Sequence, residues 1–274
     1  MKQKLLYIFT RTPLHVGAGS SVGAVDQPVQ RERHTGFPII PGSSVKGVLR
    51  DHLRALGKES LNDLFGKGDE GEDFTAGKIS FGEARLLAFP VRSAKGAFAL
   101  ATSSLALQRF ARDAGIKTPL PPPPADMTCL AGDKLVIEKK GVVLEEYRYN
   151  FAGSFPTEWE GVLTNLLSDA VLSGAKGRFV LLSDGDLSHF AMNACQVNQH
   201  VRINPDTGTA DSEHGGLFNE ETVPSECLFY APLTVLPRGA EDNAVFKSLE
   251  GEQLVQFGGN GTTGLGFCTV KLGN

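Results

Sequence analysis

The chain has 274 residues, a formal net charge of −4 and 41% hydrophobic residues, which is typical of a water-soluble protein with one large or two small domains. It contains no apolar run of membrane-spanning length, and residues 1–4 lead into a strand-like segment rather than a signal peptide. Its four cysteines include no Cys-x-x-Cys pair, which disfavours a zinc ribbon and a disulfide framework. We therefore expect a cytoplasmic protein with reduced thiols and no membrane partner.

Basic residues are concentrated at the N-terminal end of the chain. Residues 1–60 carry nine Lys and Arg against four Asp and Glu, whereas the remaining residues carry eighteen against twenty-seven. Chance clustering is one explanation. The other is a defined track for a polyanion on an acidic protein, as in a subunit placed on nucleic acid within a larger assembly.

The N-terminal segments are predicted to be a strand over 5–12, a loop over 13–42 and a helix from about 43 to 56. Ser43 or Ser44 is expected to cap the helix, and Gly57 is expected to end it. Lys46, Arg50 and Arg54 recur every four residues and therefore line one helix face.

These cations allow two interpretations. Lys and Arg on the polar face of a helix are commonly just solvated. However, a cation in the first turn opposes the helix dipole by about 0.3–1 kcal/mol, so Lys46 calls for a compensating anion. A Gly-Ser turn that opens a helix also presents free N–H groups to a phosphate.

The middle of the chain is predicted to alternate between short helices and strands. The expected elements are a helical turn over 60–65, a loop over 66–73, a strand or bulged pair over 78–91 with its irregularity at Gly82, a helix over 104–114, a stiff proline segment over 120–125, strands over 134–138, 142–146 and 147–151, a helix over 157–172 capped by Thr157, a strand over 178–183 and a helix over 186–193.

The C-terminal third is predicted to contain hairpins. Polar and apolar residues alternate over 196–204, and a strand is expected over 227–236, so together they predict a long hairpin with a polar, acidic tip at about 205–224. Strands over 252–258 and 267–272 flank a glycine-rich turn. Short helices between paired strands indicate an α+β fold, with a four-stranded antiparallel sheet at its centre and no interdomain linker.

The turn over 258–266 contains five glycines in nine residues. Such a turn exposes backbone N–H groups to a phosphate, and Thr262 and Thr263 add hydroxyl donors. A glycine-rich turn that only connects two strands is the structural alternative. The turn is not a P-loop, because no Lys follows its last glycine.

The combination of motifs is more specific than any one of them. The segment Asp26-Gln-Pro-Val-Gln-Arg-Glu-Arg-His-Thr-Gly-Phe-Pro, the Pro41-Gly-Ser-Ser-Val-Lys-Gly helix start and the C-terminal glycine turn together resemble the repeat-associated mysterious proteins (RAMPs) of CRISPR systems. Within that superfamily, the chain is similar to the repeating backbone subunit of the Cmr-type (type III-B) effector complex. The segment 217–230 resembles the thumb region of these proteins, whereas 66–195 resembles them only loosely.

The resemblance implies a ferredoxin-like, RNA-recognition-type antiparallel sheet with helices on one face, and an extended thumb hairpin over about 197–230. It implies a single domain over 1–274, with insertions over about 66–150. Expected partners are a CRISPR guide RNA, a single-stranded target RNA, further copies of the chain stacked head-to-tail and other Cmr-type subunits. The residues expected at RNA phosphates are Gly42, Ser43, Ser44, Lys46, Arg50, Gly259, Thr262, Thr263 and Gly264.

The resemblance also implicates Asp26 in cleavage of target RNA, either as a ligand of a divalent metal ion, Mg²⁺ or Mn²⁺, or as the group that activates a ribose 2′-hydroxyl. His15 is a second candidate for proton transfer. The structural alternative is that Asp26 forms a turn and pairs with Arg31 or Arg33. Two other functions remain open: a non-catalytic scaffold that binds guide RNA, and a stand-alone endoribonuclease that processes guides.

Overall fold

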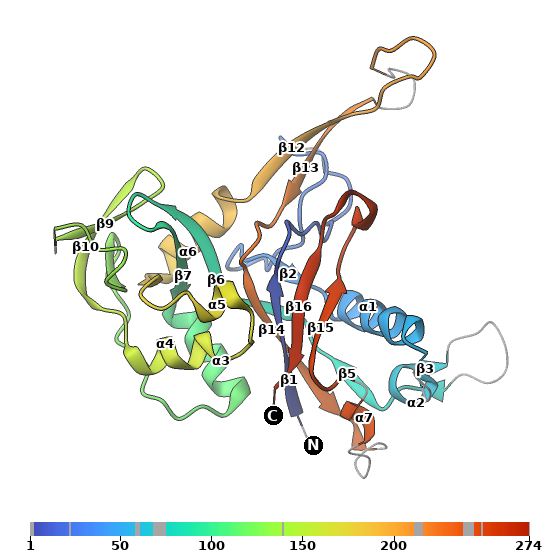
Figure 1. Ribbon diagram of the computed structural model, residues 1–274, viewed down its shortest axis with the longest axis horizontal. Coiled ribbons are helices and arrows are strands. Elements are labelled where there is room, and N and C mark those ends of the chain that lie inside the picture. The colour runs from blue at the N-terminus through green and yellow to red at the C-terminus, as the bar shows by residue number, and fades with distance from the viewer. Residues whose placement is uncertain are drawn as a thin grey trace.

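The computed structural model describes residues 3–21, 23–57, 61–67, 75–138, 140–210, 216–237, 244–247 and 249–273. Strands form one broad twisted sheet with helices packed on it, and a two-stranded hairpin projects away from the rest of the chain (Figure 1). The α+β class predicted from the sequence is confirmed. The predicted hairpin tip lies partly outside the described residues, and so does most of the predicted loop over 66–73.

The main sheet is built around β1. The strands of the main sheet, in chain order, are β1 (Gln3–Thr10), β2 (Ile39–Ile40), β5 (Ile79–Phe81), β6 (Ala84–Ser93), β7 (Ala97–Ser103), β8 (Thr128–Ala131), β9 (Gly141–Leu144), β10 (Tyr147–Ser154), β11 (Phe179–Leu182), β14 (Leu228–Val235), β15 (Glu252–Gln256) and β16 (Phe267–Leu272). The run β15-β16-β1-β14-β6-β7 is antiparallel throughout, so the antiparallel sheet expected at the centre is longer than the four strands predicted. Beyond β7 the sheet becomes mixed, because β7 pairs with β11, and β8 with β10, in parallel.

The two remaining strand pairs lie off this sheet. They are β12 (Gln196–Val201) with β13 (Leu217–Thr222), which forms the projecting hairpin, and β3 (Gly66–Lys67) with β4 (Thr75–Ala76). The hairpin therefore ends at Thr222 rather than at residue 230, because the strand predicted over 227–236 is β14 of the main sheet.

Helices cover both faces of the sheet, not one face as expected. The helices are α1 (Gly42–Ala55), α2 (Leu61–Phe65), α3 (Ser104–Ala114), α4 (Thr157–Thr164), α5 (Ala170–Ser173), α6 (Asp184–Asn193) and α7 (Ala244–Lys247). Side chains alternate along β1: Leu6 and Ile8 enter one core together with α1 and α6, whereas Leu5 and Phe9 enter a second core with α3 and α4. β1 is therefore the buried centre of both layers.

Two predicted helix caps are wrong, because a proline occupies the capping position of each helix. α1 begins at Gly42, with Pro41 in the capping position at φ −54° and no side-chain cap, so neither Ser43 nor Ser44 caps it. α4 likewise follows Pro156 rather than a Thr157 cap. In contrast, α3 spans the predicted residues 104–114 and is capped by the Ser103 hydroxyl.

Two predictions for the middle of the chain also need correction. The helix predicted over 157–172 is two helices, because the Asp169 side chain accepts the N–H groups of Val171 and Leu172 and starts α5 anew. The strand predicted over 134–138 is a turn with one isolated bridge, whereas β8 was not predicted. The break predicted at Gly82 is confirmed, since it separates β5 from β6.

Burial of α1 against the sheet predicts a measurable difference between two leucines of the same region. Leu49 is fully buried, whereas Leu56, just after the helix, is 54% exposed. Leu49→Ala should lower the free energy of unfolding by about 2–5 kcal/mol, because it removes core contacts and leaves a cavity. Leu56→Ala should change it by less than about 0.5 kcal/mol. Urea unfolding followed by circular dichroism tests both, and similar losses would contradict this packing.

Candidate nucleic-acid interface

The long loop between β1 and β2 is held in place by β13, at the base of the hairpin. The Glu221 carboxylate accepts hydrogen bonds from Arg31 Nη2 at 2.5 Å and from the backbone N–H of Val29 at 3.0 Å. The backbone N–H of Glu221 donates to Gln27 O, and its carbonyl O lies 2.7 Å from His15 Nδ1. One strand residue therefore fixes the loop at four points.

Arg31 connects this loop to α6 as well. Its guanidinium donates to Gly36 O at 2.8 Å, to Ala191 O at 2.7 Å and to Cys195 Sγ at 3.3 Å, besides Glu221. The structural alternative in which Asp26 pairs with Arg31 is not seen among the described residues, because Arg31 donates to these other acceptors.

Asp26 lies exposed on the outer part of this loop and is held by the hairpin. Its Oδ2 atom accepts the backbone N–H of Asn219 at 2.7 Å, and its carbonyl O accepts the N–H of Ser21 at 3.0 Å. Among the described residues, neither Arg31 nor Arg33 forms an ion pair with it. One carboxylate oxygen is thus anchored to a strand while the group stays open to solvent.

His15 is buried and contacts Glu220 and Glu221 of β13. Its Nε2 atom is 3.5 Å from Glu220 Oε1, and Asn260 Nδ2 donates to both oxygens of that carboxylate at 2.6 and 2.9 Å. His200 Nε2 lies 3.1 Å from Glu220 Oε2, at an ion-pair distance. Glu220, only 1% exposed, therefore joins the loop, the hairpin and the glycine turn.

The glycine turn packs directly against the segment around His15. Gly258 has φ +72°, and a Cβ atom there would lie 2.0 Å from His15 O, so only glycine fits. The N–H of Gly259 donates to His15 O at 2.9 Å. Structural constraints therefore explain part of the glycine content of this turn.

The rest of the turn is open to solvent. Gly259, Thr262, Thr263 and Gly264 are all exposed. The Thr263 hydroxyl donates to Asn260 O at 2.9 Å, whereas the Thr262 hydroxyl makes no hydrogen bond to any described residue. The N–H groups of Gly259 and Gly264 donate to His15 O and Gly261 O, so of the predicted RNA-binding groups of the turn it is the Thr262 hydroxyl that is open to a binding partner.

The start of α1 supplies the other predicted RNA-binding residues. Gly42 is needed for packing, because a Cβ atom there would lie 2.3 Å from Phe81 O. Ser43 is exposed, and Ser44, Lys46 and Arg50 are half-buried.

The start of α1 and the glycine turn were both expected at RNA phosphates. Within the described ranges, no hydrogen bond or ion pair joins Gly42, Ser43, Ser44 or Lys46 to the turn. α1 contacts β15, the strand that precedes the glycine turn, through His52 Nε2 and Gln253 Oε1 at 2.9 Å.

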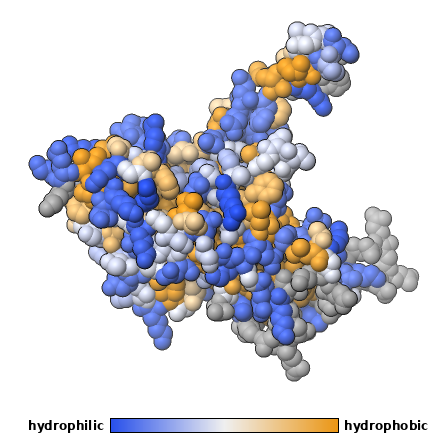
Figure 2. All heavy atoms as spheres, in the orientation of Figure 1, coloured by the Kyte–Doolittle hydropathy of each residue, from blue (hydrophilic) through white to orange (hydrophobic). Residues whose placement is uncertain are grey.

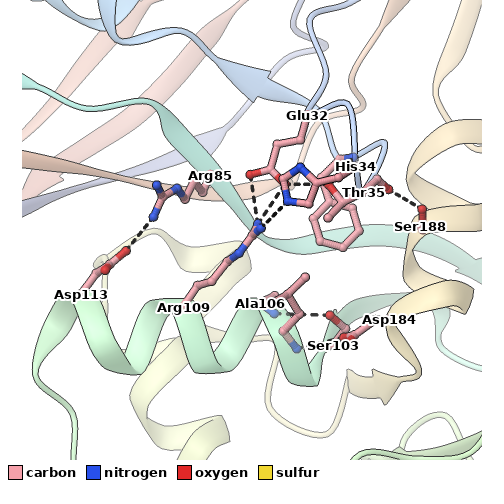
Figure 3. A network of polar contacts seen from close by, with 12 residues as sticks. Glu32, His34, Thr35, Arg85, Ser103, Ala106, Arg109, Asp113, Asp184 and Ser188 are labelled. Atoms are coloured by element: carbon pink, nitrogen blue, oxygen red, sulfur yellow. Dashed lines mark hydrogen bonds and ion pairs between the residues drawn. The ribbon is translucent and has the colours of Figure 1, made fainter.

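A second polar network, which the sequence did not reveal, lies where the loop meets α3 (Figure 3). Arg109 on α3 donates to both Glu32 oxygens at 3.0 and 2.9 Å, and its Nη2 atom is 2.9 Å from His34 Nε2. Burial would raise the pKa of Glu32, but hydrogen bonds from Thr35 and Arg109 outweigh it and hold that pKa below its usual value. The acid of this segment, Glu32, is therefore neutralised by an arginine from α3.

The described residues contain no group of three or more His, Cys, Asp or Glu side chains placed to share a metal ion. Asp26 is the exposed carboxylate of this loop, and Glu220 is already saturated by Asn260. No helix among the described residues has both the length and the hydropathy that crossing a membrane requires. All four cysteines are unpaired.

The sequence profile of the RAMP superfamily matches residues 8–269. The chain belongs to the RAMP superfamily. This RAMP protein is 39% identical to the CRISPR system Cmr endoribonuclease Cmr4 of Pyrococcus furiosus, over 99% of this chain and 96% of that protein. The family expected from the terminal motifs is confirmed.

Solved structures agree with this assignment. Oligomeric Cmr4 from Pyrococcus furiosus matches this RAMP protein with a TM-score of 0.78 and 33% identity, covering 100% of this chain and 98% of that one. A chain in the cryo-EM structure of the Type III-B Cmr-beta bound to cognate target RNA matches with a TM-score of 0.75, covering 99% and 97%, at 20% identity. The second match bears on the fold alone.

The Arg31 contacts generate a stability prediction. Arg31→Lys keeps the charge but loses the planar fork that reaches four acceptors, so the free energy of unfolding should fall by about 1–3 kcal/mol. The control is Arg33→Lys, since Arg33 is exposed and its side chain forms no hydrogen bond or ion pair with a described residue; it should stay within about 0.5 kcal/mol of wild type. Urea titration measures both, and an unchanged Arg31 variant would show that the loop is held by other contacts.

Proposed function

We propose that this chain is the repeating backbone subunit of a type III-B CRISPR complex, which binds guide RNA along its backbone and cleaves complementary target RNA. Its relationship to the endoribonuclease Cmr4 over nearly the whole of both chains supports this proposal. The observation that carries it is the exposed Asp26 carboxylate, which the hairpin base holds in place. A carboxylate in that position repels RNA phosphates, so its presence there favours a chemical role over a binding role.

The proposed path of the guide follows the two glycine-containing segments. The exposed Thr262 hydroxyl suits a phosphate contact, and so do the Ser43 hydroxyl and the Lys46 cation at the start of α1. Such contacts position RNA without reading its bases, so base pairing between guide and target supplies sequence specificity. The strand order β16-β1-β14-β6, with α1 between β1 and β6, supports a ferredoxin-like core within a single domain.

We propose that Asp26 acts on the target strand. Its carboxylate accepts the proton of a ribose 2′-hydroxyl as the 2′-oxygen attacks the adjacent phosphorus, the bond from phosphorus to the 5′-oxygen breaks, and that oxygen takes a proton from water. A divalent cation, Mg²⁺ or Mn²⁺, would supply charge stabilisation at the phosphate. In the alternative role, Asp26 would be the protein ligand of that cation, with RNA and water as the other ligands, which is how Mg²⁺ commonly binds phosphate substrates.

His15 was predicted to share this chemistry. Its Nε2 atom lies near the Glu220 carboxylate and its Nδ1 atom lies near the carbonyl O of Glu221. These contacts support a role in positioning the loop and the glycine turn. A scaffold without catalytic activity is the second candidate function, and the substitution below separates the two.

Asp26→Asn should lower the rate of target cleavage by about 10²–10⁴-fold while leaving assembly and guide binding unchanged. Asn keeps the side-chain oxygen that accepts the Asn219 N–H but loses the charge. The measurement is cleavage of labelled target RNA by a reconstituted complex in which every copy carries the substitution. Asp126→Asn, an exposed acid of another loop, is the control. Wild-type cleavage by a fully assembled Asp26→Asn complex would favour the scaffold.

The projecting hairpin is proposed to be the thumb, which crosses the guide–target duplex and meets the neighbouring copy of the chain. Apolar side chains lie exposed on it (Figure 2); they are Val197, Val201, Ile203 and Leu217, each about half exposed. Val201 and Leu217 are cross-strand partners, so they form one apolar surface on a two-stranded ribbon. A ribbon of this kind is an edge that favours a binding partner.

Replacing both Val201 and Leu217 by Thr should leave the stability of the isolated chain unchanged, because neither side chain is buried in it. Stacking of copies into a complex, measured by analytical ultracentrifugation with RNA present, should weaken. Val171→Thr is the matched control, since Val171 is 45% exposed on α5. Normal assembly and unchanged cleavage positions would exclude this surface as a contact.

A further inference from the structure

A cavity of about 370 Å³ lies between α1, the β3–β4 pair and β5. Three cations line it: Lys46 and Arg50 from α1, and Lys67 from β3. The exposed Ser80, on β5, contributes a hydroxyl group, and the floor is apolar. The cavity therefore combines charge and hydroxyl donors from separate elements.

No described residue that lines this cavity is acidic. All three cations are half-buried, yet none of their side chains forms an ion pair or a hydrogen bond with a described residue. Other cations behave differently: Arg54 on the same helix lies 3.6 Å from Asp51, and Arg109 makes a bidentate pair with Glu32. Half-buried like charges without partners repel each other, and an anion between them removes that cost.

We propose that this cavity binds a phosphate group of the guide RNA and that Lys67 is one of its ligands. The inference rests on the proposed function, because it extends the guide path from the start of α1 to the β3–β4 pair. The guide rather than the target is favoured, since the cavity shares Lys46 with the helix start and shares no lining residue with the Asp26 loop. Three cations and a hydroxyl match a contact to phosphate oxygens.

Lys67→Ala should weaken binding of a labelled single-stranded guide RNA to the full chain in filter-binding titrations over several salt concentrations. The slope of log K against log salt should fall by about 0.7, the value for one lost phosphate contact on a single strand. Lys117→Ala removes the same charge from an exposed site on the loop after α3 and should leave affinity and slope unchanged. Circular dichroism checks that each variant folds.

Lys46→Ala separates failure of the cavity proposal from failure of the proposed function. If Lys46→Ala weakens guide binding and Lys67→Ala does not, Lys67 is not a phosphate ligand, so the proposal fails and the proposed function stands. If neither variant changes guide binding, the guide path itself is wrong. If Lys67→Ala spares the guide but weakens capture of a labelled complementary RNA by the guide-loaded protein, the assignment to the guide is overturned.

Charge balance within the protein is the competing explanation for the three cations, and it has a separate test. Residues 68–74, between β3 and β4 in the sequence, carry four carboxylates and lie outside the described residues. In a background where these four acids are replaced by Asn and Gln, Lys67→Ala should still reduce the salt slope by the same amount. If its effect disappears in that background, the cations serve an intramolecular charge balance and the proposal fails.

Discussion

The arrangement of the candidate site depends on one residue of the hairpin base. Glu221 binds the long loop after β1 through its carboxylate, its N–H and its carbonyl oxygen, at His15, Gln27, Val29 and Arg31. A loop of this length has many backbone groups that need partners when they leave water. The strand supplies them, so the loop gains a defined shape without regular secondary structure of its own.

The neighbouring Glu220 extends this constraint to the opposite side of β13. Successive strand residues point to opposite faces, and Glu220 accordingly reaches Asn260 of the glycine turn and His200 of the hairpin. Loop, hairpin and glycine turn are therefore joined through two adjacent carboxylates. The Asp26 carboxylate accepts the N–H of Asn219 on the same strand, so the hairpin base sets its position.

The sequence predicted those features that depend on neighbours along the chain. The periodicity of α1 placed Lys46 and Arg50 on one face, and the glycine content located the turn before β16. It did not reveal that Glu221 pairs with Arg31, because the partners are 190 residues apart and two adjacent acids in a strand look like a solvated edge. The start of α1 was misplaced for a local reason, since Pro41 fixes the backbone that a serine cap was expected to provide.

The basic N-terminal region divides into two groups by what its cations contact. Arg31 has an acid partner in Glu221 and is committed to holding the loop, and Glu32 in turn binds Arg109 from α3. Lys46 and Arg50 have no acid partner among the described residues and face a cavity. Net charge alone hides this division, since an arginine in a buried ion pair contributes little to the field outside. The two unpaired cations on α1 therefore contribute more to that field than the paired Arg31 does.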